Sequence, residues 1–207
     1  MFVITADQVD SRREADRTGA LIDELAERYA DDLALPPDQT AGDEVQLVTP
    51  SAEAALGITL DATRTGRWSV GLGLGDVRMP LPDAARKATG PAFVAAREAV
   101  GAAKRADGRF ALRSGSPSTA SRAAEVEALV RLLVLLRERR TDEGWEAVEL
   151  VRAGHRQKDA AALLDVSAAA VSARLKTAMW RAEEDARPVL VRLLDEVDRE
   201  SAPSPDE

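Results

Sequence analysis

The chain contains 207 residues and no cysteine, and its 36 acidic and 28 basic residues give a formal net charge of −8. The lack of cysteine excludes disulfide bonds and thiolate metal sites, and the acidic balance argues against a protein that coats nucleic acid. No apolar run approaches the roughly 20 residues that span a bilayer. The first residues, Met1 to Asp7, lack the basic start and long apolar stretch of a secretory signal. We therefore expect a cytoplasmic protein without a membrane partner.

The first half of the chain shows the succession of short apolar runs and helical spacings that is typical of a mixed α/β domain. Apolar runs predict strands at residues 2–6, 45–48, 68–74 and 110–112. Helical spacing and capping residues predict helices at residues 14–30, 52–63 and 91–105. Pro36 and Pro37 are expected to break the chain, and Gly42 is expected to lie in the tip of a hairpin. We treat residues 1–115 as one domain.

The second half is predicted to be helical after a linker-like segment from Ser114 to Thr119. The stretch from Ala120 to Arg140 is apolar on more than one face, so it should be buried against the first domain or against a second copy of the chain. We assign 116–140 to a linker and dimerisation helix of a homodimer. We assign 141–200 to a helix-turn-helix DNA-binding domain and 201–207 to a disordered tail.

The region from Glu146 to Glu183 fits a helix-turn-helix because small, turn, cap and apolar positions agree in register. Ala161 is the small residue that two closely crossing helices need. Asp165, four residues later, tolerates the left-handed conformation of the turn, and Ser167 caps the second helix. Two alternatives remain open: an ordinary alanine-rich helical hairpin, and a helix-turn-helix used for protein contact.

A basic segment coincides with this motif. From Arg152 to Arg181 there are six basic and two acidic residues, a net charge of +4 in an acidic chain, as phosphate contact with double-stranded DNA requires. The second helix begins with three alanines, which cannot read base edges, so phosphate contacts should dominate and Arg174 is the expected base reader. The candidate DNA-binding residues are Arg156, Lys158, Ser167, Ser172, Arg174 and Lys176.

Acidic residues at two predicted strand ends form a candidate metal site in the first domain. Asp7 ends the first strand, and Asp43 and Glu44 lie in the hairpin. If these strands pair, the carboxylates meet at one end of the sheet and need a cation such as Mg²⁺ or Mn²⁺, with phosphates completing its ligand shell. Gly42 would let the backbone approach a phosphate closely. Alternatively, these acids simply cap a turn and face water.

Four segments taken together resemble the SatD family and, more distantly, the catalytic domains of nucleotidyl and diguanylate cyclases. The segments are Ile-Thr-Ala-Asp-Gln-Val-Asp-Ser-Arg (4–12), Gly-Asp-Glu-Val-Gln (42–46), Val-Gly-Leu-Gly-Leu-Gly (70–75) and Ala-Thr-Gly-Pro-Ala-Phe-Val-Ala-Ala-Arg-Glu-Ala (88–99). The resemblance implies an α+β fold, with a ferredoxin-like βαββαβ palm before the all-α helix-turn-helix domain. It also implies that Asp7 and Asp43 bind metal, that Gly42 belongs to the signature loop, and that Arg97 contacts the nucleotide.

Two departures from the cyclase pattern favour ligand binding over catalysis. Ala41 stands where the signature loop has its first glycine, and Phe93 stands where cyclases carry a transition-state asparagine. Cyclisation needs preorganised charge at the reacting phosphate. We therefore expect a DNA-binding transcriptional regulator whose degenerate cyclase-like domain binds a nucleotide and Mg²⁺ or Mn²⁺. An active metal-dependent cyclase and a structural adaptor are the alternatives.

Overall fold

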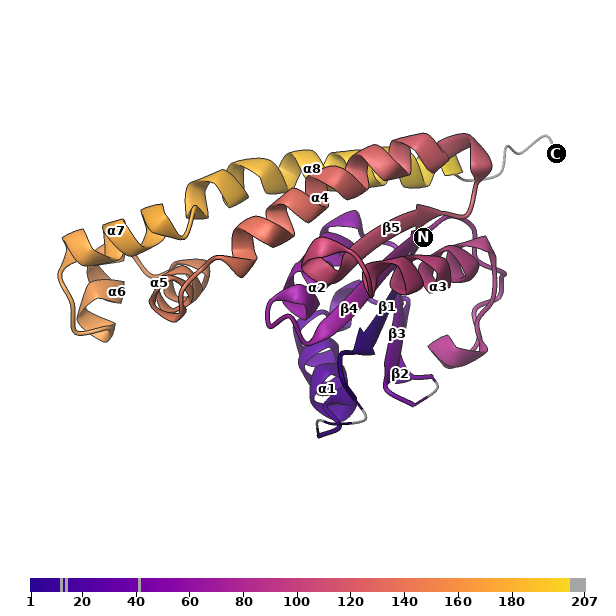
Figure 1. Cartoon of the computed structure of the whole chain (residues 1–207), viewed down its shortest axis with the longest axis horizontal. Coiled ribbons are helices and arrows are strands. Elements are labelled where there is room, and N and C mark those ends of the chain that lie inside the picture. The colour runs from indigo at the N-terminus through magenta and orange to yellow at the C-terminus, as the bar shows by residue number, and fades with distance from the viewer. Residues whose placement is uncertain (12, 14, 41, 202–207) are drawn as a thin grey trace. The chain divides into compact units, whose positions relative to one another are not determined.

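A five-stranded sheet organises the first part of the chain (Figure 1). The computed structural model describes residues 1–11, 13, 15–40 and 42–201. The strands are β1 (Phe2–Gln8), β2 (Leu35–Gln39), β3 (Glu44–Thr49), β4 (Trp68–Leu74) and β5 (Phe110–Ser114). Their order is β2-β3-β1-β4-β5; β4 and β5 are parallel and the other neighbours are antiparallel. The α+β class expected from the sequence is confirmed.

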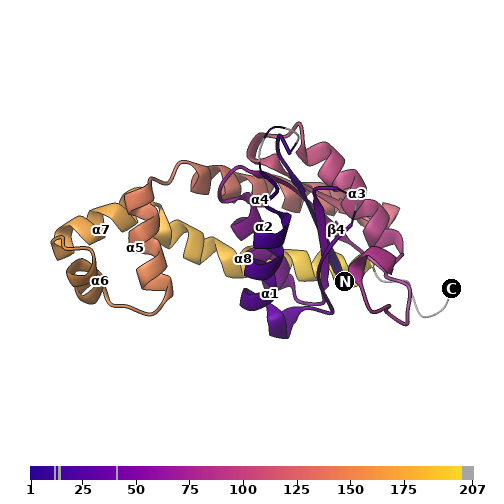
Figure 2. The same ribbon diagram turned by 90° about the horizontal axis from the view of Figure 1, so that it is seen from below.

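Helices cover both faces of this sheet. Figure 2 shows α1 (Thr18–Arg28) and α2 (Ala52–Thr63) on one face and α3 (Pro91–Ala103) on the other. The bounds of α2 and β4 agree with the sequence prediction. At the start of α2 the Ser51 hydroxyl accepts a hydrogen bond from the Ala54 amide at 3.1 Å, as an N-cap serine does. Short 3₁₀ turns occur at Ala30–Asp32, Ala85–Lys87, Asp107–Arg109 and Pro117–Thr119.

The glycine-rich strand β4 allows α3 to pack directly on the sheet. A Cβ added to Gly71 would lie 2.2 Å from the Val100 amide nitrogen, and one added to Gly73 would lie 2.2 Å from the Ala92 carbonyl oxygen. These distances leave no room for any side chain. The alternating glycines of β4 therefore leave a bare surface on which α3 lies.

Pro36 and Pro37 do not break the chain as expected, because both lie inside β2. This strand is at the edge of the sheet, and its pairing with β3 shifts register between Leu35 and Asp38. An edge strand can accommodate prolines, since a proline without an amide hydrogen costs no ladder bond on the open side or at a bulge.

Contacts divide the chain into two units. The first unit comprises Met1–Val134 together with the chain from Leu190, and the second unit comprises Leu135–Val189. Helices α4 (Ala120–Glu138) and α8 (Trp180–Ser201) each contain residues of both units. The C-terminal half of α8, which falls in the range 141–200 that the sequence assigns to the DNA-binding domain, is thus grouped with the sheet. The sequence predicts a disordered tail at 201–207. Ser201 is instead the last residue of α8, and residues 202–207 lie outside the described residues.

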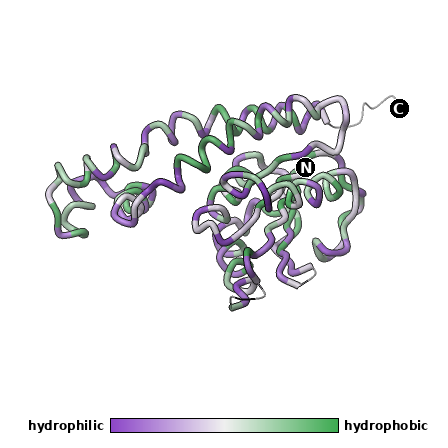
Figure 3. Tube along the Cα trace, in the orientation of Figure 1, coloured by the Kyte–Doolittle hydropathy of each residue, from purple (hydrophilic) through white to green (hydrophobic). Residues whose placement is uncertain are grey.

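The part of α4 up to Val134 packs into the first unit. Val126 and Val130 are buried, whereas Leu129 and Leu132 are exposed. The Glu127 carboxylate accepts the Leu112 amide of the edge strand β5 at 2.7 Å. Figure 3 shows the apolar character that runs along the strands and through α4. No helix in the described ranges has the length and apolar character needed to cross a bilayer.

The second unit contains the end of α4, α5 (Asp142–Arg152), α6 (Gln157–Leu163), α7 (Ala168–Thr177) and the beginning of α8. Its buried core is formed by Trp145, Ala147, Val148, Ala160, Ala161, Val171, Leu175 and Ala178. The predicted small residue Ala161 lies in this core, together with Val171 and Leu175 of α7.

Candidate functional site

A tight turn joins α6 and α7 with the chemistry that the sequence predicts. Asp165 adopts a left-handed conformation with φ of +52°, which aspartate tolerates better than most residues. Val166 packs against the core of the second unit. The Ser167 hydroxyl then accepts the Ala170 amide at 3.1 Å and begins α7. Because Val171 and Leu175 are buried, α7 packs on α5 and α6 through one face and leaves the other face open.

The open face of α7 carries Ser172 and Lys176, both exposed. Arg156 and Lys158, at the start of α6, are exposed too. Among the residues that the structure describes, none of these three cations forms an ion pair. Their charges therefore stay available to an external anion such as a phosphate.

Arg174, the expected base reader, lies on a different side of α7. Its guanidinium Nη1 is 3.1 Å from Oε2 of Glu146 on α5, and only a quarter of its side chain is exposed. A guanidinium held by a carboxylate of the supporting helix orients α7 on α5. The Arg174 side chain is therefore less free to reach a base than the side chains of Ser172 and Lys176.

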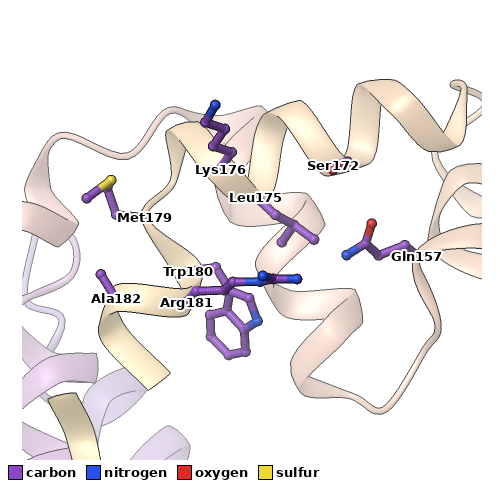
Figure 4. A pocket seen from close by; sticks show the side chains of 8 residues that line it. All are labelled: Gln157, Ser172, Leu175, Lys176, Met179, Trp180, Arg181 and Ala182. Atoms are coloured by element: carbon purple, nitrogen blue, oxygen red, sulfur yellow. The ribbon is translucent and has the colours of Figure 1, made fainter. Parts of the chain in front are cut away.

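A hollow of about 500 Å³ lies where α7 ends and α8 begins (Figure 4). Its lining comprises Gln157, Ser172, Leu175, Lys176, Met179, Trp180, Arg181 and Ala182. Only Ser172 and Lys176 of these are predicted site residues, so the polar residues Gln157 and Arg181 were missed. Arg181 was counted in the basic segment, but it follows the predicted second helix, so no local signal associated it with Ser172 and Lys176.

A buried carboxylate, Glu183, joins three helices of the second unit. Its side chain is fully buried and lies 2.8 Å from Arg140 and 2.5 Å from Arg152, with Arg137 in direct contact. The guanidinium of Arg140 also stacks on the Trp145 ring at 4.3 Å. Burial by itself would raise the pKa of Glu183, but the three arginines outweigh it and hold this pKa below its ordinary value. The cluster fixes the ends of α4 and α5 to the beginning of α8.

The structure brings Asp7 and Asp43 to one end of the sheet. Asp7 faces Glu44 across the β1–β3 ladder, and the Gln8 amide donates to the Asp43 carbonyl at 3.2 Å. Both aspartates line a hollow of about 540 Å³ that also contains Arg13 and Lys104. The Lys104 ammonium lies 2.7 Å from the Asp7 carboxylate.

Three other predicted residues do not line this hollow. The Glu44 carboxylate accepts the Thr40 hydroxyl at 2.7 Å, and Arg97 is exposed on α3 without lining the hollow. Gly42, with φ of +68°, lines an adjoining hollow together with Asp43. Ala41, the position of the missing signature glycine, lies outside the described residues.

The two carboxylates of the acidic hollow, Asp7 and Asp43, could bind a cation that takes few protein ligands. Within the described ranges, no group of three or more acidic, histidine or cysteine side chains could hold a metal ion by itself. Mg²⁺ commonly takes one or two carboxylates and completes its octahedron with water and substrate phosphates. Asp7 and Asp43 fit that mode of binding, and Lys104 and Arg13 would neutralise phosphate charge.

Comparison of the chain with protein-family models, with curated proteins and with solved structures found no match. Functional conclusions therefore rest on the residues and on their geometry.

Proposed function

We propose that this protein is a DNA-binding regulator and that α6, its turn and α7 form a helix-turn-helix. One observation carries the proposal. The α6–α7 pair has a buried core face, a left-handed turn residue and a capped second helix, while its open face presents Ser172 and Lys176. A capped second helix with a free polar face is what entry into the major groove requires.

The open face assigns roles to individual residues. Lys176 and Arg181, with Arg156 and Lys158 at the start of α6, contact phosphates. Ser172 and the methyl groups of the neighbouring alanines meet base edges, where alanine contacts thymine methyl groups. Arg174 positions α7 through Glu146. Sequence preference is accordingly weak, and most of the affinity is electrostatic.

Salt-dependent binding to a pool of duplexes tests this proposal. Fluorescence anisotropy of the full chain measures DNA affinity at several salt concentrations. The magnitude of the slope of log affinity against log salt should decrease by about one for Lys176→Gln, and by about one more when Arg181→Gln is added. Arg139→Gln, a change at an exposed arginine near the end of α4, is the matched control and should keep the slope. Absence of binding at low salt, or a slope unchanged in the double variant, would refute the proposal.

For the first unit, we propose a ferredoxin-like palm that binds a nucleotide. The order β2-β3-β1-β4 with antiparallel neighbours, and α1 and α2 as the two connections, supports a βαββαβ arrangement. The hollow with Asp7 and Asp43 supports a metal–phosphate ligand at its end. Phe93, at the position of the cyclase asparagine, is buried in the core. That position offers no polar group, so we propose binding without efficient turnover.

A thermal-shift experiment tests the nucleotide proposal. Mn²⁺ together with a nucleoside triphosphate should raise the Tm more than either alone, and Asp43→Asn should abolish the increment. Asp31→Asn, at an exposed position of the same unit, should leave the increment intact. Chromatography of the same mixture measures turnover, and a cyclic product would favour the catalytic alternative. A Tm that does not change at millimolar nucleotide would refute the proposal of nucleotide binding.

A further inference from the structure

We infer that the hollow between the end of α7 and the beginning of α8 binds a small aromatic anion. The hollow lies entirely within the second unit, and no residue of the proposed nucleotide site contributes to it. Its volume of about 500 Å³ falls in the range of sites for small organic ligands.

The floor of the hollow is apolar. Leu175, Met179 and Trp180 line it, and in Figure 4 the Arg181 side chain lies between the Leu175 side chain and the Trp180 indole. The Arg152 guanidinium stacks on Trp180, with its Cζ 5.1 Å from the ring centroid. The indole is therefore held in place before any ligand binds. A fixed indole offers a flat surface for an aromatic ring.

The rim is positive. Lys176 and Arg181 line the hollow, and among the described residues no acidic side chain does, although the chain carries 36 acidic residues. Neither cation forms an ion pair with a residue in the described ranges. In Figure 4 the Arg181 guanidinium lies over the hollow and Gln157 points its amide toward it. An anionic group on the ligand would meet Arg181 and Gln157, while its ring lies on Trp180.

The backbone between the two helices creates this shape. Met179 adopts φ of +54°, a left-handed conformation that is costly for a residue with a long side chain. Its side chain is half exposed, with 49% accessible. The turn brings Trp180 and Arg181 of α8 next to Ser172 and Lys176 of α7, and strain of this kind is commonly retained at binding sites.

The ligand and DNA would compete for this surface. Ser172 and Lys176 line the hollow and also belong to the face that we propose for DNA, so this part of the inference rests on the proposed function. A bound anion would neutralise Lys176 and Arg181 and occupy the space beside α7. The site would thus make DNA binding responsive to a small molecule.

Two dyes of nearly the same shape test the site without DNA. The anionic probe is 1-anilinonaphthalene-8-sulfonate and the neutral probe is N-phenyl-1-naphthylamine. Fluorescence titration of the full chain should show saturable binding of the anionic dye. Arg181→Gln should weaken that binding roughly five-fold, the scale of a partly exposed ion pair, and should change binding of the neutral dye less than about two-fold.

Ala182→Leu provides a second variant, because Ala182 is exposed on α8 and a leucine there fills the hollow without removing charge. It should weaken both dyes, whereas Arg139→Gln should affect neither. Equal loss of both dyes in Arg181→Gln, or unchanged binding in Ala182→Leu, would overturn the inference. Displacement of bound dye by a duplex then tests competition separately, so a failure of DNA binding would leave the dye result standing.

Discussion

At the residue scale, Glu183 is the charge on which the second unit depends most. Its carboxylate is fully buried among Arg137, Arg140 and Arg152, and two of these arginines are themselves buried. Such a cluster is poor evidence of net stabilisation, because desolvation of the ions offsets much of their attraction. Removal of the Glu183 carboxylate is a different matter, since the guanidinium groups then lose an anion that compensates their burial.

Glu183→Gln should therefore lower the free energy of unfolding by about 3–5 kcal/mol. The neighbouring Glu184 is exposed, and Glu184→Gln should change the same quantity by less than about 0.5 kcal/mol. Urea denaturation followed by circular dichroism compares the two variants. A loss for Glu183→Gln no larger than that of its neighbour would contradict the assignment.

The same group predicts the response to acid. Because the folded pKa of Glu183 lies below its ordinary value of 4.5, its contribution to stability is fully present above about pH 4.5. It is lost as the pH falls through the lower folded pKa. The denaturation midpoint of the wild type should thus fall more steeply than that of Glu183→Gln below about pH 4.5. Parallel midpoint curves for the two proteins would argue against a depressed pKa.

At the element scale, the contact between β4 and α3 is the most constrained packing in the first unit. Gly71→Ala would place a Cβ against the backbone of Val100, and overpacking against backbone should cost about 3 kcal/mol or more. Gly101 lies within α3 with nothing within 4 Å of an added Cβ. Gly101→Ala should therefore stabilise by about 0.5–1 kcal/mol. Thermal unfolding distinguishes the two, and equal effects would mean that α3 does not lie on β4.

The elements that were predicted correctly have local signals in the sequence. The cap at Ser51 and the alternation from Trp68 to Leu74 each lie within a few neighbouring residues, so α2 and β4 could be delimited. The position of Pro36 and Pro37 inside a strand could not be predicted, because it depends on β2 being an edge strand, which local sequence does not reveal.

Side-chain partners were predicted less well than elements, for a similar reason. Asp7 and Asp43 could be brought together because Asp7 lies near the end of β1 and Asp43 directly precedes β3, the strand that pairs with β1. The contact of Arg174 with Glu146 spans 28 residues, and the clustering of three arginines on Glu183 joins separate helices. Charged residues on amphipathic helices look solvent-exposed in sequence, and only the packing of the helices decides which of them are buried.

At the scale of the whole molecule, the long apolar helix has less surface for self-association than its sequence implies. Four of its valines and leucines (Val126, Val130, Leu133 and Val134) are buried and Leu135 and Leu136 are half-buried, so Leu129 and Leu132 are the ones that stay strongly exposed. Our proposal of a homodimer now depends on these two leucines, because exposure of apolar side chains to water is unfavourable and burial at an interface would relieve it.

Light scattering at micromolar concentration should give a dimer for the wild type and a monomer for Leu132→Glu. Leu163→Glu changes an equally exposed leucine of α6 and should leave the oligomeric state unchanged. A monomeric wild type would remove the dimer, and with it any expectation of paired half-sites about one helical turn of DNA apart.

The central claim is that the α6–α7 pair contacts DNA. Amide hydrogen exchange of the full chain, with and without a saturating duplex pool at low salt, measures this contact without any substitution. We expect slower exchange in peptides covering residues 156–181. Slower exchange confined to the first unit, or none in 156–181 when anisotropy reports bound DNA, would contradict it.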